Sequence, residues 1–173
     1  KFAYHADLLT DIILGKVASR NGPGIMPMFA YADFDADGYR DLVLGAPQCC
    51  SVAAKLRYHR GISSGGVEQN YTAIAHVGGA TTVLAADFTL DGRLDLFVGS
   101  DNWHYGVNLG GKSFLYTNDG DSTPFSDPPM LVTDYNQPLY DFDLGFVINY
   151  DNDPDHTPDI VVANADQGSY ILR

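Results

Sequence analysis

The sequence has few of the residues that carry redox, nucleic-acid or membrane chemistry. Its 173 residues include two cysteines, one tryptophan and ten lysines or arginines, and 22 acids give a formal net charge of −12. Because phosphate contacts dominate nucleic-acid affinity, we expect no nucleic-acid partner for so acidic a chain. No apolar run approaches the roughly 18 residues of a membrane span, and no helical period is visible. The length suits about one packed domain, built from strands.

Recognisable catalytic motifs are also missing, so we expect the protein not to be an enzyme. The five histidines are scattered, and neither a G-x-S-x-G elbow nor a G-x-x-x-x-G-K-[ST] phosphate loop occurs. Asp141 and Asp143 form the one acidic pair outside the loops considered next, and a strand would place both on one face. Cys49 and Cys50 are adjacent, which favours buried or free thiols over an oxidised pair.

Aspartate is abundant and is arranged in a repeated loop of nine residues. The first copy has aspartates at positions 1, 3, 5 and 9 (Asp33, Asp35, Asp37 and Asp41), with Gly38 at position 6. The spacing recurs from Asp87 to Asp95 and from Asp151 to Asp159, and each copy leads into an apolar strand. A worn copy with Asp7 and Asp11 opens the chain. Of the 22 acids, only Glu68 is a glutamate, so the pattern is more than a general preference for acidic surface.

Alternate carboxylates in a tight loop can converge on one hard cation. Calcium takes 6–8 oxygen ligands in a forgiving geometry, whereas the helical EF-hand loop needs a glutamate at position 12. Position 12 is apolar in all three copies, and nitrogen and sulfur ligands are absent, which argues against zinc. Aspartate and glycine also make good turns, but three copies at one spacing favour a metal. We therefore expect up to three Ca²⁺ ions.

The copies differ at two positions that matter for binding. Position 6 needs a sharp reversal, which Gly38 and Gly92 allow because glycine adopts positive φ without steric cost. His156 stands there in the third loop, so that loop is expected to be strained. Thr89 replaces an aspartate at position 3 of the second loop. As a neutral ligand it predicts weaker binding at the second site than at the first.

The loops recur at a period of 54 residues from Asp33 to Asp87 and of 64 from Asp87 to Asp151. A four-stranded antiparallel unit repeated at this length is typical of propeller blades. We predict a partial blade over 1–24, blades over 25–77 and 78–136, and a partial blade over 137–173. The expected strands are 12–14; 28–32, 42–44, 55–59 and 71–77; 82–86, 96–98, 113–117 and 130–133; 145–150, 160–162 and 169–172.

Two motifs resemble known repeat families. D-x-D-x-D-G-x-x-D-L-x-x-G-A-P, from Asp33 to Pro47, resembles the FG-GAP repeat of integrin α-subunit propellers, and Leu115 to Asp121 with Phe125 resembles the related VCBS repeats. The resemblance covers nearly the whole chain and implies an all-β fold, a β-propeller with calcium between strands 1 and 2 of a blade. The implied ligands are Asp33, Asp35, Asp37, the Tyr39 carbonyl and Asp41; Asp87, Thr89, Asp91 and Asp95; and Asp151, Asp153, Asp155 and Asp159.

The chain holds only part of a propeller, which closes with about 4–8 blades. Lys1 opens it, so we expect a processed product or a fragment of a longer chain. Alternatively, blades from several chains complete one another. The 30 residues between Asp11 and Asp41 are too few for a whole blade and indicate a degenerate or missing piece. An unclosed array exposes sheet edges, which would promote self-association.

Two stretches are candidates for contacts with a partner. Trp103, His104 and Tyr105 lie in the longest connection on the face opposite the calcium loops. The indole either stacks on a sugar or a partner side chain, or caps the core of the next blade. Asn70-Tyr71-Thr72 follows a Gly/Ser turn and matches the N-glycosylation pattern, which makes Asn70 a candidate for modification.

The resemblance implies an extracellular protein, secreted or at the cell surface, with structural calcium. We expect an adhesion or recognition module for a protein or glycan partner. Incomplete blades and exposed edges favour an alternative, a structural subunit of an extracellular fibre or surface assembly. A third possibility is the non-catalytic propeller part of a polysaccharide-active enzyme, because some polysaccharide lyases and hydrolases resemble or carry such propellers.

Overall fold

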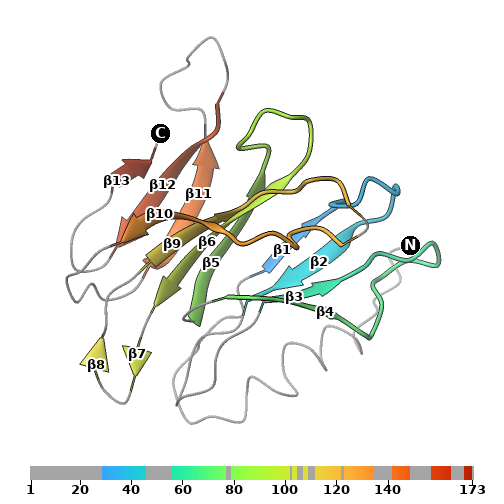
Figure 1. Cartoon of the computed structure of the whole chain (residues 1–173), viewed down its shortest axis with the longest axis horizontal. Coiled ribbons are helices and arrows are strands. Elements are labelled where there is room, and N and C mark those ends of the chain that lie inside the picture. The colour runs from blue at the N-terminus through green and yellow to red at the C-terminus, as the bar shows by residue number, and fades with distance from the viewer. Residues whose placement is uncertain are drawn as a thin grey trace, which may run out of the picture.

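The computed structural model describes the central and C-terminal parts of the chain, shown in colour in Figure 1. These are residues 29–45, 56–76, 79–101, 103–104, 107–108, 112–121, 123–134, 142–148, 157–164 and 170–172. The predicted strand 12–14, the worn first loop, Cys49, Cys50, Tyr105, Asp141, Asp151, Asp153, Asp155 and His156 lie outside them. Every regular element in these ranges is a strand, which confirms the all-β prediction. None of the described segments forms a helix that could cross a membrane.

The first sheet comprises β1 (Phe29–Ala32), β2 (Asp41–Leu44), β3 (Leu56–His59) and β4 (Thr72–Ile74). They pair antiparallel in chain order. Val43 and Leu56 are fully buried, as expected for apolar residues on central strands. The strands correspond to the four predicted ones, although β4 is shorter than the predicted 71–77.

The second sheet comprises β5 (Gly79–Ala86), β6 (Asp95–Asp101), β9 (Lys112–Tyr116) and β10 (Met130–Asp134). Its order is β10-β9-β6-β5. β5 begins three residues before the predicted start because Gly79 and Ala80 pair with the end of β6, ahead of a register shift between Ala80 and Thr82. A small hairpin of β7 (Trp103–His104) and β8 (Val107–Asn108) leaves this sheet between β6 and β9.

A third sheet of three strands ends the chain. It contains β11 (Phe142–Ile148), β12 (Asp159–Asn164) and β13 (Tyr170–Leu172), paired antiparallel in that order. β11 starts earlier than the predicted 145–150, with a register shift between Phe142 and Leu144. The three units therefore repeat one antiparallel pattern, as predicted.

The sheets pack against one another through their first strands, as propeller blades do. β5 lies between β1 and β11 and contacts both (Figure 1). One hydrophobic core joins the first two sheets, with Ile74 and Leu56 on one side and Leu96 and Phe114 on the other. Burying each leucine removes it from water and contributes about 2 kcal/mol. The described strands form propeller-like blades but do not close into a ring.

A buried polar pair crosses the boundary between these two blades. The imidazole Nδ1 of His76 forms a hydrogen bond with the Tyr116 hydroxyl at 2.6 Å, and that hydroxyl donates to the Ala75 carbonyl at 3.0 Å. Burial lowers the pKa of His76 to about 4 and raises the pKa of Tyr116. The histidine is therefore neutral in the folded protein near pH 7.

Candidate metal centre

The first acidic loop joins β1 to β2, and its own backbone N–H groups hold its shape by donating hydrogen bonds to its aspartate side chains. Asp33 accepts the N–H of Asp37 at 3.1 Å through Oδ1 and that of Gly38 at 2.9 Å through Oδ2. Asp37 accepts the N–H of Tyr39 at 2.9 Å. Such short-range bonds are the reason aspartate favours turns. Gly38 has a φ of 90°, so the predicted reversal at position 6 is present.

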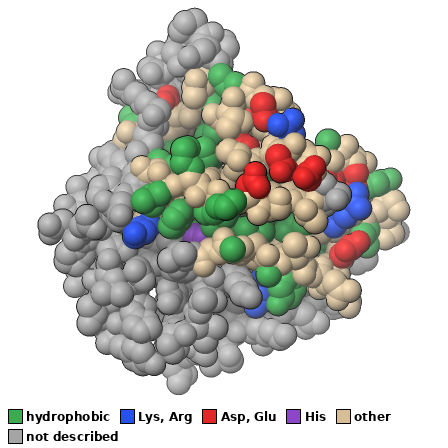
Figure 2. Space-filling view, viewed as in Figure 1, with side chains coloured by type: hydrophobic (Ala, Val, Ile, Leu, Met, Phe, Trp, Pro, Cys, Tyr) green, Lys and Arg blue, Asp and Glu red, His purple; other side chains and the backbone are tan. Residues whose placement is uncertain are grey.

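This loop brings three of its predicted ligands together. Asp33, Asp35 and Asp37, the acidic triad, each offer a carboxylate oxygen within 4.8 Å of the others. Among the described residues this is the one group of three or more His, Cys, Asp or Glu that could hold a metal ion. On the face shown in Figure 2, acidic side chains gather beside a few basic ones. The Tyr39 side chain is exposed.

Asp35 is the buried member of the triad. Its side chain is only 5% exposed, and Oδ2 accepts no well-aligned hydrogen bond from the described residues. Burial raises the pKa of the Asp35 carboxyl, the charge of Asp41 raises it further, and the guanidinium of Arg60 opposes both. A buried carboxylate oxygen is costly unless a cation or a donor satisfies it, and the Arg60 guanidinium is the cation that pairs with Asp35 Oδ2 in this structure. The donor set, made only of oxygen, suits a hard cation.

Arg60 is the partner of the triad that sequence reasoning missed. It follows β3 and places Nε 2.7 Å from Asp35 Oδ2, while Nη2 donates to Asp37 Oδ2 at 3.0 Å. The negative charge of Asp35 is the main cause of the raised pKa of the Arg60 guanidinium. A lone arginine 23 positions after Asp37 gives no local signal, because only strand pairing brings the two together.

The aspartate at position 9 is placed differently from the triad. Asp41 begins β2 and is fully buried. Its Oδ2 accepts the N–H of Phe34 at 2.8 Å, and its Oδ1 accepts the N–H of Gly61 at 2.6 Å. Asp41 thus ties the acidic loop to the start of the β3–β4 connection. It lies outside the group of three, and its role as a metal ligand stays a prediction.

The second acidic loop, between β5 and β6, repeats the backbone pattern. Asp87 accepts the N–H groups of Asp91 at 3.0 Å and Gly92 at 2.8 Å. Gly92 has a φ of 87°. The side chain of Arg93 bridges Asp91 and Asn118: its Nη2 lies 2.5 Å from Asp91 Oδ2, and its Nε donates to the Asn118 carbonyl at 2.6 Å. The described part of this loop does not gather three acids as the first loop does.

Asp95, at position 9 of the second loop, repeats the role of Asp41. It is fully buried, and its Oδ2 accepts the backbone N–H of Phe88 and both the N–H and the hydroxyl of Thr89 at 3.0–3.1 Å. Its Oδ1 accepts the N–H of Asn118 at 2.9 Å. The Thr89 hydroxyl donates to Asp95, and its weak ligation of a metal ion stays a prediction.

Asn118 connects the two loops across the blade boundary. Its Nδ2 donates to the Phe34 carbonyl at 2.7 Å and to the Leu94 carbonyl at 3.2 Å. The rings of Phe34 and Phe125 meet edge to face, 5.3 Å apart. In the third blade only Asp159 is described among the predicted ligands; it begins β12 and is buried.

The geometry agrees with a comparison against known families. The model of the FG-GAP-like repeat matches residues 33–98, from the first acidic loop through the second. Over this stretch the chain is similar to that repeat. The predicted resemblance is confirmed for this stretch, while likeness to VCBS repeats and to integrin α-subunits stays a prediction. No curated protein matches the chain.

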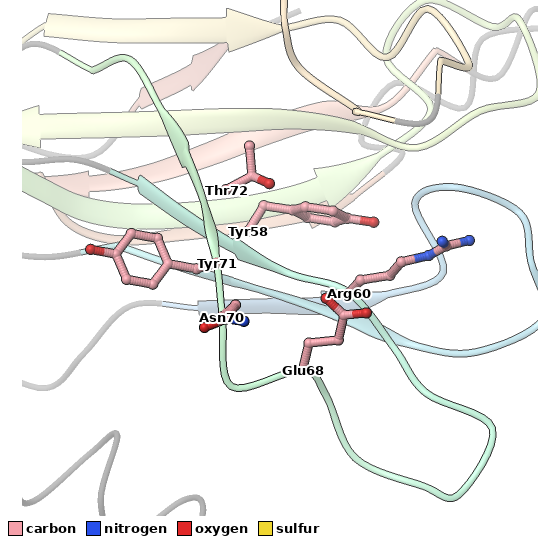
Figure 3. Close-up of a pocket in the computed structure, with 6 residues that line it drawn as sticks. All are labelled: Tyr58, Arg60, Glu68, Asn70, Tyr71 and Thr72. Carbon is pink, nitrogen blue, oxygen red and sulfur yellow. The ribbon is translucent and has the colours of Figure 1, made fainter.

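A small pocket lies on the first blade and includes Arg60 in its wall (Figure 3). Its volume is about 160 Å³, and it is lined by Tyr58, Arg60, Glu68, Asn70, Tyr71 and Thr72. The Tyr58 hydroxyl is buried and lies near the Asp41 carboxylate. Burial raises its pKa, and the charges of Asp41 and Asp35 add to that effect. The pocket therefore shares Arg60 with the metal centre.

The two predicted contact stretches lie at different places. Asn70 is exposed and lines the pocket, which satisfies the exposure that its modification requires. Tyr71 is 50% exposed, with the guanidinium of Arg57 5.0 Å from its ring centroid. Trp103 and His104 form β7 of the small hairpin rather than part of an irregular loop. Their contact with a partner stays a prediction.

Proposed function

We propose that the chain belongs to an extracellular propeller in which Ca²⁺ stabilises the acidic loops and the assembled blades recognise a protein or glycan partner. The observation that supports it best is the convergence of Asp33, Asp35 and Asp37 within the stretch that matches the FG-GAP-like repeat model. These residues fit a hard cation. A bound ion would supply charge neutralisation, and the role we propose is not catalytic.

The protein residues would use that neutralisation to hold the loop between β1 and β2. Three carboxylates in one loop repel one another, and the −12 net charge of the chain adds to this. Asp41 and Gly61 already join the loop to the β3–β4 connection. Calcium at the triad would therefore stabilise the end of the blade on which both connections lie.

Thermal unfolding with calcium and with chelator tests the metal. If Ca²⁺ binds the native state, a hundredfold excess over Kd adds about 2.7 kcal/mol to the free energy of unfolding. We expect Asp35→Asn to lose much of that gain and the exposed Asp127→Asn to keep it. An unchanged Tm of the wild-type chain in calcium and in EDTA would refute the metal role.

A glycan array and a panel of cell-surface proteins, each probed in calcium and in EDTA, test the recognition role. Calcium-dependent binding is the expected result. Substituting Tyr71 by alanine would then show whether the pocket contributes, because Tyr71 offers an exposed ring at its rim. If a partner binds equally well in calcium and in EDTA, recognition does not depend on the bound metal ion.

One observation favours the second candidate, a subunit of an extracellular assembly. β10 lies at the edge of the second sheet and carries three consecutive exposed apolar residues, Met130, Leu131 and Val132. Such edges pair readily with other strands. Light scattering across a concentration series tests this candidate, because a strictly monomeric particle would rule it out.

A further inference from the structure

Strand pairing determines where Arg60 lies. β2 and β3 are antiparallel, with Leu42 opposite His59, so the residue after His59 lies beside the start of β2. The acidic loop ends at that point. The pairing of β2 with β3 thus places Arg60 next to the triad. The Arg60 side chain is 48% exposed and contacts the triad from the solvent side.

The hydrogen bonds of the triad divide its oxygens into two groups. Backbone N–H groups of the same loop bind both oxygens of Asp33 and the Oδ1 atoms of Asp35 and Asp37. The remaining two oxygens, Asp35 Oδ2 and Asp37 Oδ2, both face Arg60. Any cation that uses the oxygens left over by the loop backbone must therefore meet the guanidinium.

We propose that Arg60 is a tethered cation that competes with the metal ion for the acidic triad and thereby sets the affinity of this site. The inference rests on the proposed calcium role. A guanidinium and a divalent ion repel each other and cannot both hold the same two oxygens. Partly exposed ion pairs are weak, so the competition lowers metal affinity by a modest factor, roughly twofold to fivefold.

In the second blade the arginine at the acidic loop is held differently from Arg60 in the first blade. Arg93 also reaches an aspartate of its loop, but its Nε is anchored on the Asn118 carbonyl. Arg60 has no second anchor of this kind: within the described residues its guanidinium hydrogen-bonds to Asp37 and pairs with Asp35. Arg60 is therefore free to leave when a metal ion enters.

Displacement of Arg60 would reach the neighbouring pocket. Arg60 forms part of the pocket wall with Tyr58 and Glu68, and Figure 3 shows the Tyr58 hydroxyl and the Glu68 carboxylate on the same side as Arg60. A guanidinium released from the triad has Glu68 as its nearest acidic neighbour in that wall. Metal occupancy would thus change the charge and shape of the pocket.

Calcium titration calorimetry of the whole chain tests the competition. We expect Arg60→Gln to bind calcium at this site roughly twofold to fivefold more tightly than wild type. Arg57→Gln is the matched control, because it removes the same charge from the same strand region but lies over Tyr71. Combining Arg60→Gln with Asp35→Asn assigns the effect to the triad, and the gain should then disappear.

A second readout follows Arg60 itself. In ¹⁵N spectra of wild type, the Nε–H signal of Arg60 is assigned as the one that disappears in Arg60→Gln. This signal should shift when calcium is added, whereas the Nε–H signal of Arg57 should stay in place. Equal gains in the Arg60 and Arg57 variants, weaker binding by Arg60→Gln, or an unmoved Nε–H signal would overturn the competition while leaving the calcium role intact. Absence of calcium binding in every variant would overturn both.

Discussion

Asp95 offers the sharpest test of what the position 9 aspartates do. Its carboxylate is fully buried and accepts four hydrogen bonds, from Phe88, Thr89 twice and Asn118. Asp95→Asn keeps the shape but replaces one oxygen by an amide that can only donate. The asparagine oxygen serves the three donors of Phe88 and Thr89, so the amide is left facing the N–H of Asn118.

The cost follows from these contacts. A buried N–H without an acceptor costs about 1–3 kcal/mol, and bonds to a charged acceptor are stronger than those to a neutral one. Removing a buried charge offsets part of the loss. We expect Asp95→Asn to lower the free energy of unfolding by about 3 kcal/mol.

Urea unfolding in EDTA measures this loss without any contribution from bound metal. With a slope of about 2 kcal/mol per molar urea, the midpoint should fall by about 1.5 M. The exposed Asp127→Asn should leave it unchanged. If Asp95→Asn is as stable as wild type in EDTA and weaker only in calcium, the hydrogen-bonding role is refuted and Asp95 acts as a metal ligand.

Two further substitutions test the packing at the boundary between the first two blades and beside Asp41. Between about pH 6.5 and 4 the wild-type histidine His76 is neutral when folded and takes up a proton on unfolding, so the free energy of unfolding is highest above pH 6.5 and lower by roughly 2–3 kcal/mol near pH 4.5. His76→Phe should remove this loss, which urea midpoints measured across pH would show. Equal pH profiles would contradict this. Gly61→Ala would place a Cβ 2.7 Å from the Arg40 carbonyl oxygen and should cost about 1–3 kcal/mol in thermal unfolding, whereas the exposed Ser63→Ala should cost little; a stable Gly61→Ala would show that the backbone can move.

The acidic loops serve two purposes that look alike in sequence. The triad of the first loop faces Arg60, while Asp41 and Asp95 turn inward to bind the β3–β4 and β9–β10 connections of their blades. Asn118 then joins the two loops. Calcium binding at the triad would therefore act on a loop that is already part of the contact between blades.

Local order explains why the triad was predictable. Asp33, Asp35 and Asp37 converge through hydrogen bonds that span two to five residues, with positive φ at Gly38. Strand order was predictable for a similar reason, because each acidic loop is followed directly by an apolar strand of one repeat. Strand ends were less predictable: β5 and β11 start earlier because their pairing with β6 and β12 continues beyond a register shift, which the sequence does not mark.

The spacing of aspartate, glycine and apolar residues was enough to establish an all-β repeat, its antiparallel blades and a carboxylate cluster suited to a hard cation. The carboxylate cluster depends on hydrogen bonds between residues close in the chain, and the repeated strand order follows from the recurrence of the loops. The burial of Asp41 and Asp95, the arrival of Arg60 at the triad and the shared pocket were decided by the folded sheets. Each requires segments about 20 or more residues apart to meet, and only the pairing of β2 with β3 and of β6 with β9 selects which residues those are.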